Sequence, residues 1–311
     1  MPRGTPGLFF ALESRGVPRG TLSSLHGANR LAAGFTSLAK PFLEHGGGRR
    51  SPTSDPVSRV IAIANQKGGV GKTSTAVNLA ASLAAAEQRT LLIDGDPQGN
   101  ATSGMGIKPD EIGTTAYEVL LGEKSIREAI LAERHFKHLD LVPATPDLAG
   151  AEVELVERND RERMMRAAVA EARDGYDYVL IDCPPSLGLI TLNMLAAADA
   201  LLIPVQCEYY ALEGLSQLLN TVHLIQRNIN PDLAIEGVLL TMFDARLNLS
   251  RQVANEAREY FGNKVFETVI PRNVRLAEAP SFGKPIILYD VASVGAQAYI
   301  SVAKELMARR P

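Results

Sequence analysis

The residues best suited to chemistry form a stretch rich in glycine and lysine. It consists of Lys67, Gly68, Gly69, Val70, Gly71, Lys72, Thr73 and Ser74. Glycines let several backbone N–H groups point to one place without Cβ clashes, and a following helix adds the positive end of its dipole. Lys72 would reach the β- and γ-phosphates of ATP, and the Thr73 hydroxyl would join a Mg²⁺ shell. The pattern predicts a phosphate-binding loop and disfavours an ordinary glycine-rich turn.

The loop departs from the general G-x-x-x-x-G-K-[ST] pattern at its start. Gln66 occupies the first glycine position, and Lys67 adds a second lysine. Since Lys72 already serves the terminal phosphates, two interpretations of Lys67 stay open. It is either a solvated charge or a cation that reaches a second nucleotide across a dimer interface.

Two carboxylates follow the apolar run at 90–93. Asp94 and Asp96 are two residues apart, so in strand geometry they point to the same side. Either one could touch the metal shell or orient an attacking water, or both could merely cap the turn before Pro97. Gly95 replaces the apolar residue expected between them, and we therefore expect this strand to be packed more loosely.

A third carboxylate, Asp182, ends the apolar run at 178–181. This arrangement is typical of a residue that holds Mg²⁺ directly or through water, although many buried strands also end in an aspartate. Cys183 follows it, and the other cysteine is Cys207. Neither has a spacing typical of metal ligands, and Cys183 is interpreted as a small buried apolar residue.

Alternating strands and helices are predicted to position these groups. Short apolar runs indicate strands at 60–64, 90–93, 139–142, 178–181, 200–205, 235–240 and 265–270. Helical spacing occurs at 73–86, 151–173, 212–227, 249–261 and 294–309. The alternation predicts an α/β fold, with a mostly parallel twisted sheet flanked by helices on both faces.

Composition separates a basic leader from the rest of the chain. The 311 residues are 46% hydrophobic and 22% charged, which excludes collagen-like and coiled-coil classes. Residues 1–57 are rich in Gly, Pro, Ser and Arg, and we expect them to be a disordered basic extension. Several interpretations of this extension stay open. It is a solvated leader, a segment upstream of the true start, a transit peptide or a nucleic-acid-binding arm. Residues 58–311 form the predicted ATPase domain. With two cysteines and no apolar run of about 18 residues, a soluble cytoplasmic protein is expected.

The loop at 67–73 resembles the deviant Walker A loop of the ParA/MinD ATPases, and the string Asp-Pro-Gln-Gly-Asn at 96–100 resembles the ParA (Soj) branch. The resemblance covers about 58–311. It implies that Lys67 reaches into the partner's site and that both Lys67 and Lys72 take part in catalysis. Asp96 would be the catalytic acid and would also contribute to the metal site. It further implies that Pro271 and Asn273 border the adenine, and that Arg246 and Arg275 contact DNA phosphates.

The function implied by the resemblance is a Mg²⁺-dependent ATPase that dimerises on ATP and binds DNA nonspecifically. A ParB-like centromere-binding partner would stimulate hydrolysis, and the cycle would segregate a chromosome or plasmid at the nucleoid. One alternative is a MinD-like membrane-positioning ATPase, which needs a basic amphipathic C-terminal helix. Here the apolar stripe of the last helix is better explained by packing on the sheet. A second alternative, a relative of the nitrogenase iron protein, needs cluster-binding cysteines, and we expect no iron–sulfur cluster.

Overall fold

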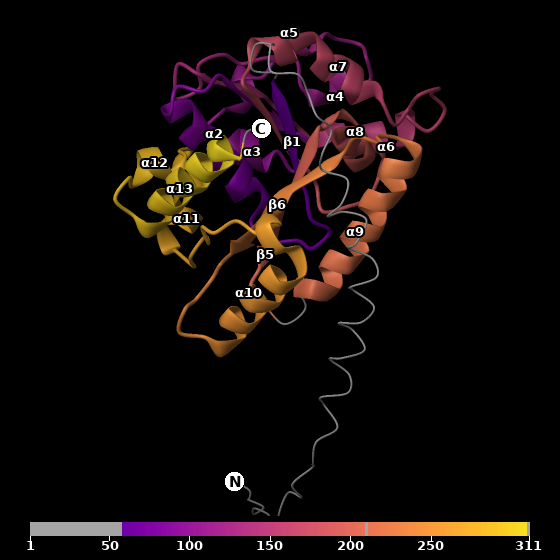
Figure 1. Ribbon diagram of the computed structural model, residues 1–311. Coiled ribbons are helices and arrows are strands. Elements are labelled where there is room, and N and C mark those ends of the chain that lie inside the picture. Colours follow the sequence, from indigo (N-terminus) through magenta and orange to yellow (C-terminus); the bar gives the residue numbers. More distant parts are fainter. Residues whose placement is uncertain (1–57, 209–210, 310–311) are drawn as a thin grey trace, which may run out of the picture.

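The computed structural model describes residues 58–208 and 211–309, and these residues build one parallel sheet (Figure 1). The strand order is β3-β2-β4-β1-β5-β6, and all five neighbouring pairs are parallel. The strands are β1 (Arg59–Ile63), β2 (Thr90–Asp94), β3 (Leu139–Val142), β4 (Tyr178–Asp182), β5 (Ala200–Gln206) and β6 (Ala234–Thr241). Because the strands are parallel, all six carboxyl ends meet at one edge of the sheet, where open α/β sheets bind ligands. The predicted fold class is confirmed.

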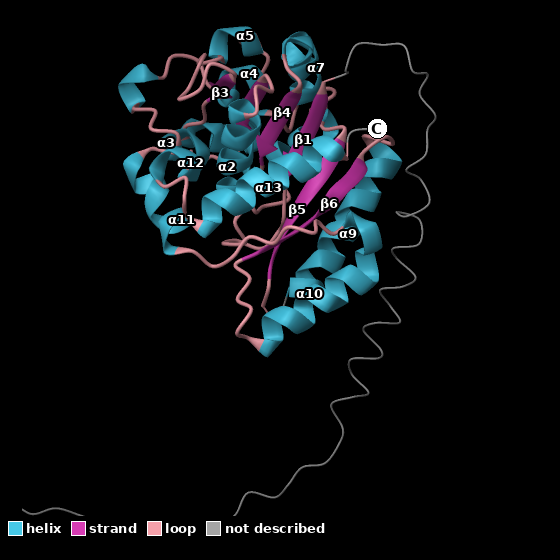
Figure 2. Cartoon of the chain, turned by 60° about the vertical axis from the view of Figure 1, so that its left-hand side comes forward, coloured by secondary structure: helices cyan, strands magenta, loops and turns pink. Residues whose placement is uncertain are grey.

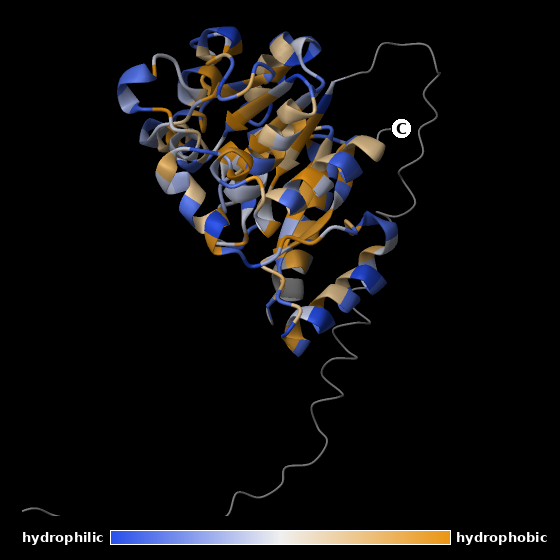
Figure 3. Cartoon of the chain, turned by 90° about the vertical axis from the view of Figure 1, so that its left-hand side faces the viewer, coloured by the Kyte–Doolittle hydropathy of each residue, from blue (hydrophilic) through white to orange (hydrophobic). Residues whose placement is uncertain are grey.

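The sheet is buried on both faces. Along β1, Val60 and Ala62 belong to one hydrophobic core, whereas Ile61 and Ile63 belong to the core on the opposite face. Successive side chains of a strand point to opposite faces, so a strand that is apolar throughout must be covered twice. Figure 3 shows the strands as a hydrophobic centre inside helices with hydrophilic outer surfaces.

Two layers of helices provide this cover (Figure 2). The core on the Ile61 side is closed by α2 (Lys72–Ala85), α3 (Asn100–Gly104), α12 (Ile286–Tyr289) and α13 (Val294–Ala308), with α11 (Val274–Glu278) at its margin. The core on the Val60 side is closed by α4 (Ala116–Leu120), α5 (Ile126–Ala129), α6 (Ala151–Glu154), α7 (Met164–Ala172), α8 (Leu189–Ala197), α9 (Ala211–Asn228) and α10 (Asn248–Phe261).

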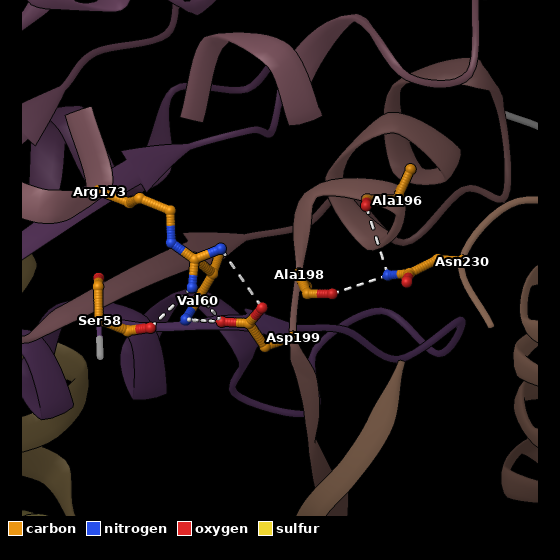
Figure 4. Close-up of polar contacts among 7 residues, drawn as sticks. All are labelled: Ser58, Val60, Arg173, Ala196, Ala198, Asp199 and Asn230. Atoms are coloured by element: carbon orange, nitrogen blue, oxygen red, sulfur yellow. Dashed lines mark hydrogen bonds and ion pairs between the residues drawn. The ribbon is translucent and has the colours of Figure 1, made fainter. Parts of the chain in front are cut away.

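Side-chain hydrogen bonds fix the amino ends of β1 and β5 (Figure 4). The Val60 N–H donates to Asp199 Oδ2 at 2.9 Å, and Arg173 donates both to the Ser58 carbonyl at 2.8 Å and to the Asp199 carboxylate. The Asn230 amide donates to the carbonyl of Ala198 at 2.8 Å. These bonds hold the strands in register from the end opposite to the candidate site.

Two predicted elements were wrong. Residues 265–270 form no strand. Within this segment only Val265 makes an isolated bridge to β6, and the amides of Glu267 and Thr268 donate instead to the carboxylate of Glu305 on α13, at 2.9 and 3.1 Å. The helix predicted at 151–173 is broken into α6 and α7. Between them Asp160 has a φ of 58°, a left-handed conformation through which an α-helix cannot continue.

The last helix packs inward, as predicted from its apolar stripe. Tyr299, Val302 and Leu306 on α13 are buried in the core on the Ile61 side, and the Tyr299 hydroxyl lies 3.2 Å from Thr75 Oγ1 on α2. In the described part of the chain, no helix has the length and hydropathy that crossing a membrane requires. The predicted basic extension at 1–57 lies outside the described residues.

Candidate nucleotide site

The glycine-rich loop joins β1 to α2 at the carboxyl edge of the sheet. Gly69 and Gly71 have φ angles of 73° and 87°, which glycine adopts without the Cβ penalty of other residues. Two side chains brace the loop: the Asn65 amide donates to the Pro204 carbonyl at 2.7 Å, and Thr241 Oγ1 donates to the Val70 carbonyl at 2.8 Å. The loop is therefore tied to the ends of β5 and β6.

The two lysines of the loop lie in different surroundings. Lys72 is 6% exposed, and its Nζ donates to the Lys67 carbonyl at 3.2 Å, inside the curve of the loop. Burial lowers the pKa of Lys72, while Asp182 opposes this effect. Lys67 instead pairs with Glu208, which follows β5, with 3.4 Å between Nζ and Oε2. In this arrangement Lys72 contacts the backbone of its own loop, whereas the Lys67 ammonium is held by a carboxylate outside the loop.

Asp182 lies at the centre of the site. It ends β4 and is paired with Asp94 of β2 on one side and Ile63 of β1 on the other, so the loop and all three acids come from adjacent strands. Its side chain is fully buried, and neither carboxylate oxygen has a hydrogen-bond partner among the described residues. Burial and the neighbouring Asp94 raise the pKa of Asp182 well above its usual range, against the opposing effects of Thr73 and Lys72.

An unpartnered buried carboxylate beside a threonine hydroxyl fits a Mg²⁺ site. Oxygen ligands suit this ion, which keeps several waters and is completed by substrate phosphates rather than by a full protein cage. The described residues contain no cluster of three or more His, Cys, Asp or Glu that could hold a metal ion by themselves.

The other two acids have distinct environments. Asp94 is fully buried and accepts hydrogen bonds from the Thr102 N–H and hydroxyl, at 2.8 and 2.7 Å. Burial raises the pKa of Asp94 to about 6. Asp96 instead accepts one hydrogen bond, from the Gln98 N–H at 3.0 Å. The hydrogen bonds from Thr102 thus tie Asp94 to α3. Of these two acids, Asp96 is the one whose carboxylate can accept further hydrogen bonds.

Gly95 is packed tightly, which contradicts the looser strand expected from its small side chain. Its N–H donates to the Asp182 carbonyl at 2.9 Å. A Cβ at this position would lie 2.7 Å from that same carbonyl oxygen and 3.0 Å from Met194 Cε. Only glycine lets β2 and β4 approach this closely beside the carboxylates.

Comparison with known proteins decides the family. A family described as an AAA domain matches residues 58–235. The chromosome partitioning protein ParA of Myxococcus xanthus is 60% identical over 88% of this chain and 95% of its own length. The sporulation initiation inhibitor protein Soj of Bacillus subtilis is 58% identical over 81% of this chain and 99% of its own. This chain belongs to the ParA/Soj family of chromosome-partitioning ATPases.

A solved structure shares the fold. Cobyrinic acid a,c-diamide synthase from Mycobacterium smegmatis, with bound ATP analogue and magnesium, is 38% identical. Its TM-score is 0.70, over 82% of this chain and 98% of that one. Its name refers to a different reaction, and the higher identity to partitioning proteins places this chain with the ParA/Soj family.

The ParA/Soj resemblance assigned Pro271 and Asn273 to the adenine. Pro271 bridges to Phe243, two residues after the Thr241 that braces the loop. Asn273 is the N-cap of α11, and its Oδ1 accepts a hydrogen bond from the Leu276 N–H at 3.2 Å. The Asn273 side chain is therefore used as a helix cap, and the adenine contact of both residues stays a prediction.

The two arginines assigned to DNA are each paired with carboxylates of this chain. Arg246 is 87% exposed at its side chain and forms a two-pronged contact with Asp244, whose pKa it lowers to about 2. Arg275 pairs with Glu278 at 3.0 Å and with Asp290 at 3.7 Å. No hydrogen bond or ion pair between described residues links either arginine to the nucleotide site.

Sequence reasoning missed the residues that brace this ParA/Soj site. Each of Asn65, Thr102, Glu208 and Thr241 makes a side-chain contact with a residue at least 42 positions away. Local spacing carries no signal for such contacts. The prediction that Cys183 is buried is confirmed. Cys207 is buried as well, and burial raises the pKa of Cys207 to about 11.

Proposed function

We propose that this ATPase uses Mg²⁺ and ATP to form a sandwich dimer that binds DNA without sequence preference. With a ParB-like centromere-binding partner that stimulates hydrolysis, it segregates a chromosome or plasmid and associates with the nucleoid. The observation that carries the proposal is the contrast between the two lysines. Lys72 is held inside its own loop, whereas Lys67 is directed out of it and held only by a half-exposed carboxylate.

The residues of one chain bind the triphosphate. Backbone N–H groups of the loop and the Lys72 ammonium would donate hydrogen bonds to the phosphate oxygens. The negative phosphates would also offset the free-energy cost of burying the Lys72 cation. Thr73 and Asp182 would hold Mg²⁺, which neutralises charge on the β- and γ-phosphates. Asp96 would orient the attacking water, because its carboxylate is not consumed by the contacts that commit Asp94 to α3.

The residues of the second chain complete the charge balance. Two triphosphates facing each other repel strongly unless cations lie between them. Lys67 would leave Glu208, reach the partner's phosphates and supply one such cation from each chain. The pair that it leaves is a surface ion pair worth only about 0–1 kcal/mol, so the exchange has a small cost. Whether the protein is a monomer or a dimer would therefore depend on which nucleotide is bound. Dimerisation would also double the number of DNA contacts made by Arg246 and Arg275.

A MinD-like membrane role receives no support from the last helix. Its apolar stripe is buried against α2 and is not free to enter a bilayer.

The test combines oligomeric state with DNA binding. Sedimentation and an electrophoretic shift on random-sequence DNA are measured with no nucleotide, ADP, ATP and a nonhydrolysable ATP analogue. Dimers and DNA binding are expected in the triphosphate states alone. Lys67→Ala should bind ATP but stay monomeric, and Lys72→Ala should lose ATP binding by at least about 100-fold. A wild-type protein that stays monomeric with the analogue contradicts the proposal.

A further inference from the structure

Helix α10 presents a polar face that the nucleotide site does not use. Figures 1 and 2 both place α10 at the end of the molecule opposite α5. Its buried side consists of Ser250, Val253, Ala254, Ala257 and Phe261. The exposed side carries two rows of residues three or four positions apart, which is the spacing of one helix face. One row is Asn248, Arg251, Asn255 and Arg258, and the other is Gln252, Glu256 and Glu259.

The first row, here named the arginine row, carries cations that no carboxylate neutralises. In the described parts of the chain, Arg251 and Arg258 form no salt bridge, and Arg251 donates only to the neutral Asn248 side chain, at 2.6 Å. Arg246 and Arg275 are different, because each already has a carboxylate partner that a phosphate would have to displace. An exposed arginine without a carboxylate partner can donate hydrogen bonds to a phosphate without first breaking an ion pair.

We propose that the arginine row of α10 is part of the DNA-binding surface and contacts backbone phosphates. This inference rests on the proposed function and extends it to residues beyond Arg246 and Arg275. Arg251 and Arg258 are seven residues apart, or about 10 Å along the helix. They therefore contact different phosphates, while Asn255 between them and Asn248 before them offer neutral donors. The row continues from Arg246, which lies just before the start of α10. Since Lys/Arg contacts to phosphate carry no base information, the surface binds any sequence.

The experiment measures affinity for random-sequence double-stranded DNA as a function of salt, with the nonhydrolysable ATP analogue bound. Arg251→Ala and Arg258→Ala are each expected to weaken binding roughly 5- to 10-fold, and each should reduce the slope of log affinity against log salt by about 1. Gln252→Ala, on the neighbouring row, and Arg166→Ala, an exposed arginine on α7, are the matched controls. Both controls should leave affinity and slope unchanged. Alanine is a good helix former, so none of these variants should lose helix stability.

Three outcomes separate the inference from the function on which it rests. Weaker binding by the two arginine-row variants with unchanged controls supports the inference. If wild type binds and Arg275→Ala weakens binding, but Arg251→Ala and Arg258→Ala match wild type in affinity and slope, the inference is wrong and the proposed function stands. If the wild-type protein binds DNA in none of the nucleotide states, both the inference and the proposed function are wrong.

Discussion

Gly95→Ala is the substitution with the most direct structural consequence. The added methyl group would lie 2.7 Å from the Asp182 carbonyl oxygen and 3.0 Å from Met194 Cε, and neither β4 nor the buried Met194 has free space to retreat into. Overpacking of this kind costs about 1–3 kcal/mol of unfolding free energy. Gly95 does not have a positive φ, so its backbone conformation also suits alanine. Because alanine restricts the unfolded chain more than glycine does, the substitution also stabilises the folded state by about 0.4–1 kcal/mol. The net expectation is a loss of about 1–2 kcal/mol.

The same methyl group would push β2 away from β4 beside the three carboxylates. ATP hydrolysis is therefore expected to fall by more than the loss of folded protein explains. Denaturant unfolding and thermal melting measure the first effect, with an expected drop in Tm of about 2–8 °C. Gly175→Ala is the matched control, because a Cβ there meets no atom within 4 Å. If Gly95→Ala is as stable as Gly175→Ala and hydrolyses ATP at the wild-type rate, close packing of β2 on β4 does not position the acids.

Three further predictions concern the carboxylates. Asp96→Ala should retain ATP binding and dimerisation but lose turnover, so that protein accumulates on DNA in a shift assay with ATP; normal turnover would remove Asp96 from the mechanism. Asp182→Asn should raise the unfolding free energy without Mg²⁺ by about 1–3 kcal/mol, because burial disfavours the charged carboxylate on folding and an amide has no charge to lose, and should abolish Mg²⁺-dependent hydrolysis; unchanged stability would contradict this. Because the pKa of Asp94 is raised to about 6 when folded, its contribution to stability is present below about pH 4 and is lost as the pH rises through 6. The difference in unfolding free energy between wild type and Asp94→Asn should therefore shrink between pH 4 and 7, and a flat difference would count against it.

Much of the fold followed from the sequence because the parallel strands are short, apolar and buried on both faces. The predicted phosphate loop and the three acids lie together because they end or follow β1, β2 and β4, which are adjacent in the sheet. Sequence order alone could not show that β4 lies between β1 and β2. That placement makes Asp182, rather than Asp94, the central carboxylate.

The failed predictions have physical causes that act over long distances. Residues 265–270 have strand-like composition, yet Glu305 on a distant helix takes two of their amides. Gly95 was expected to loosen its strand, because the approach of a backbone carbonyl from β4 is invisible in local sequence. The partner of Lys67 was also hidden, since Glu208 is 141 residues away in sequence and the fold brings the two side chains together.

The contact of Glu305 with Glu267 and Thr268 has a consequence for assembly. A parallel sheet ends in an outermost strand whose unpaired peptide groups invite another chain to extend it. Beside β6, the neighbouring segment bridges at Val265 and Pro271, and between these points the amides of Glu267 and Thr268 donate to a carboxylate, so it offers an incoming strand no continuous ladder. Growth of the sheet from one molecule into the next is blocked on that flank, which favours reversible self-association over fibre formation.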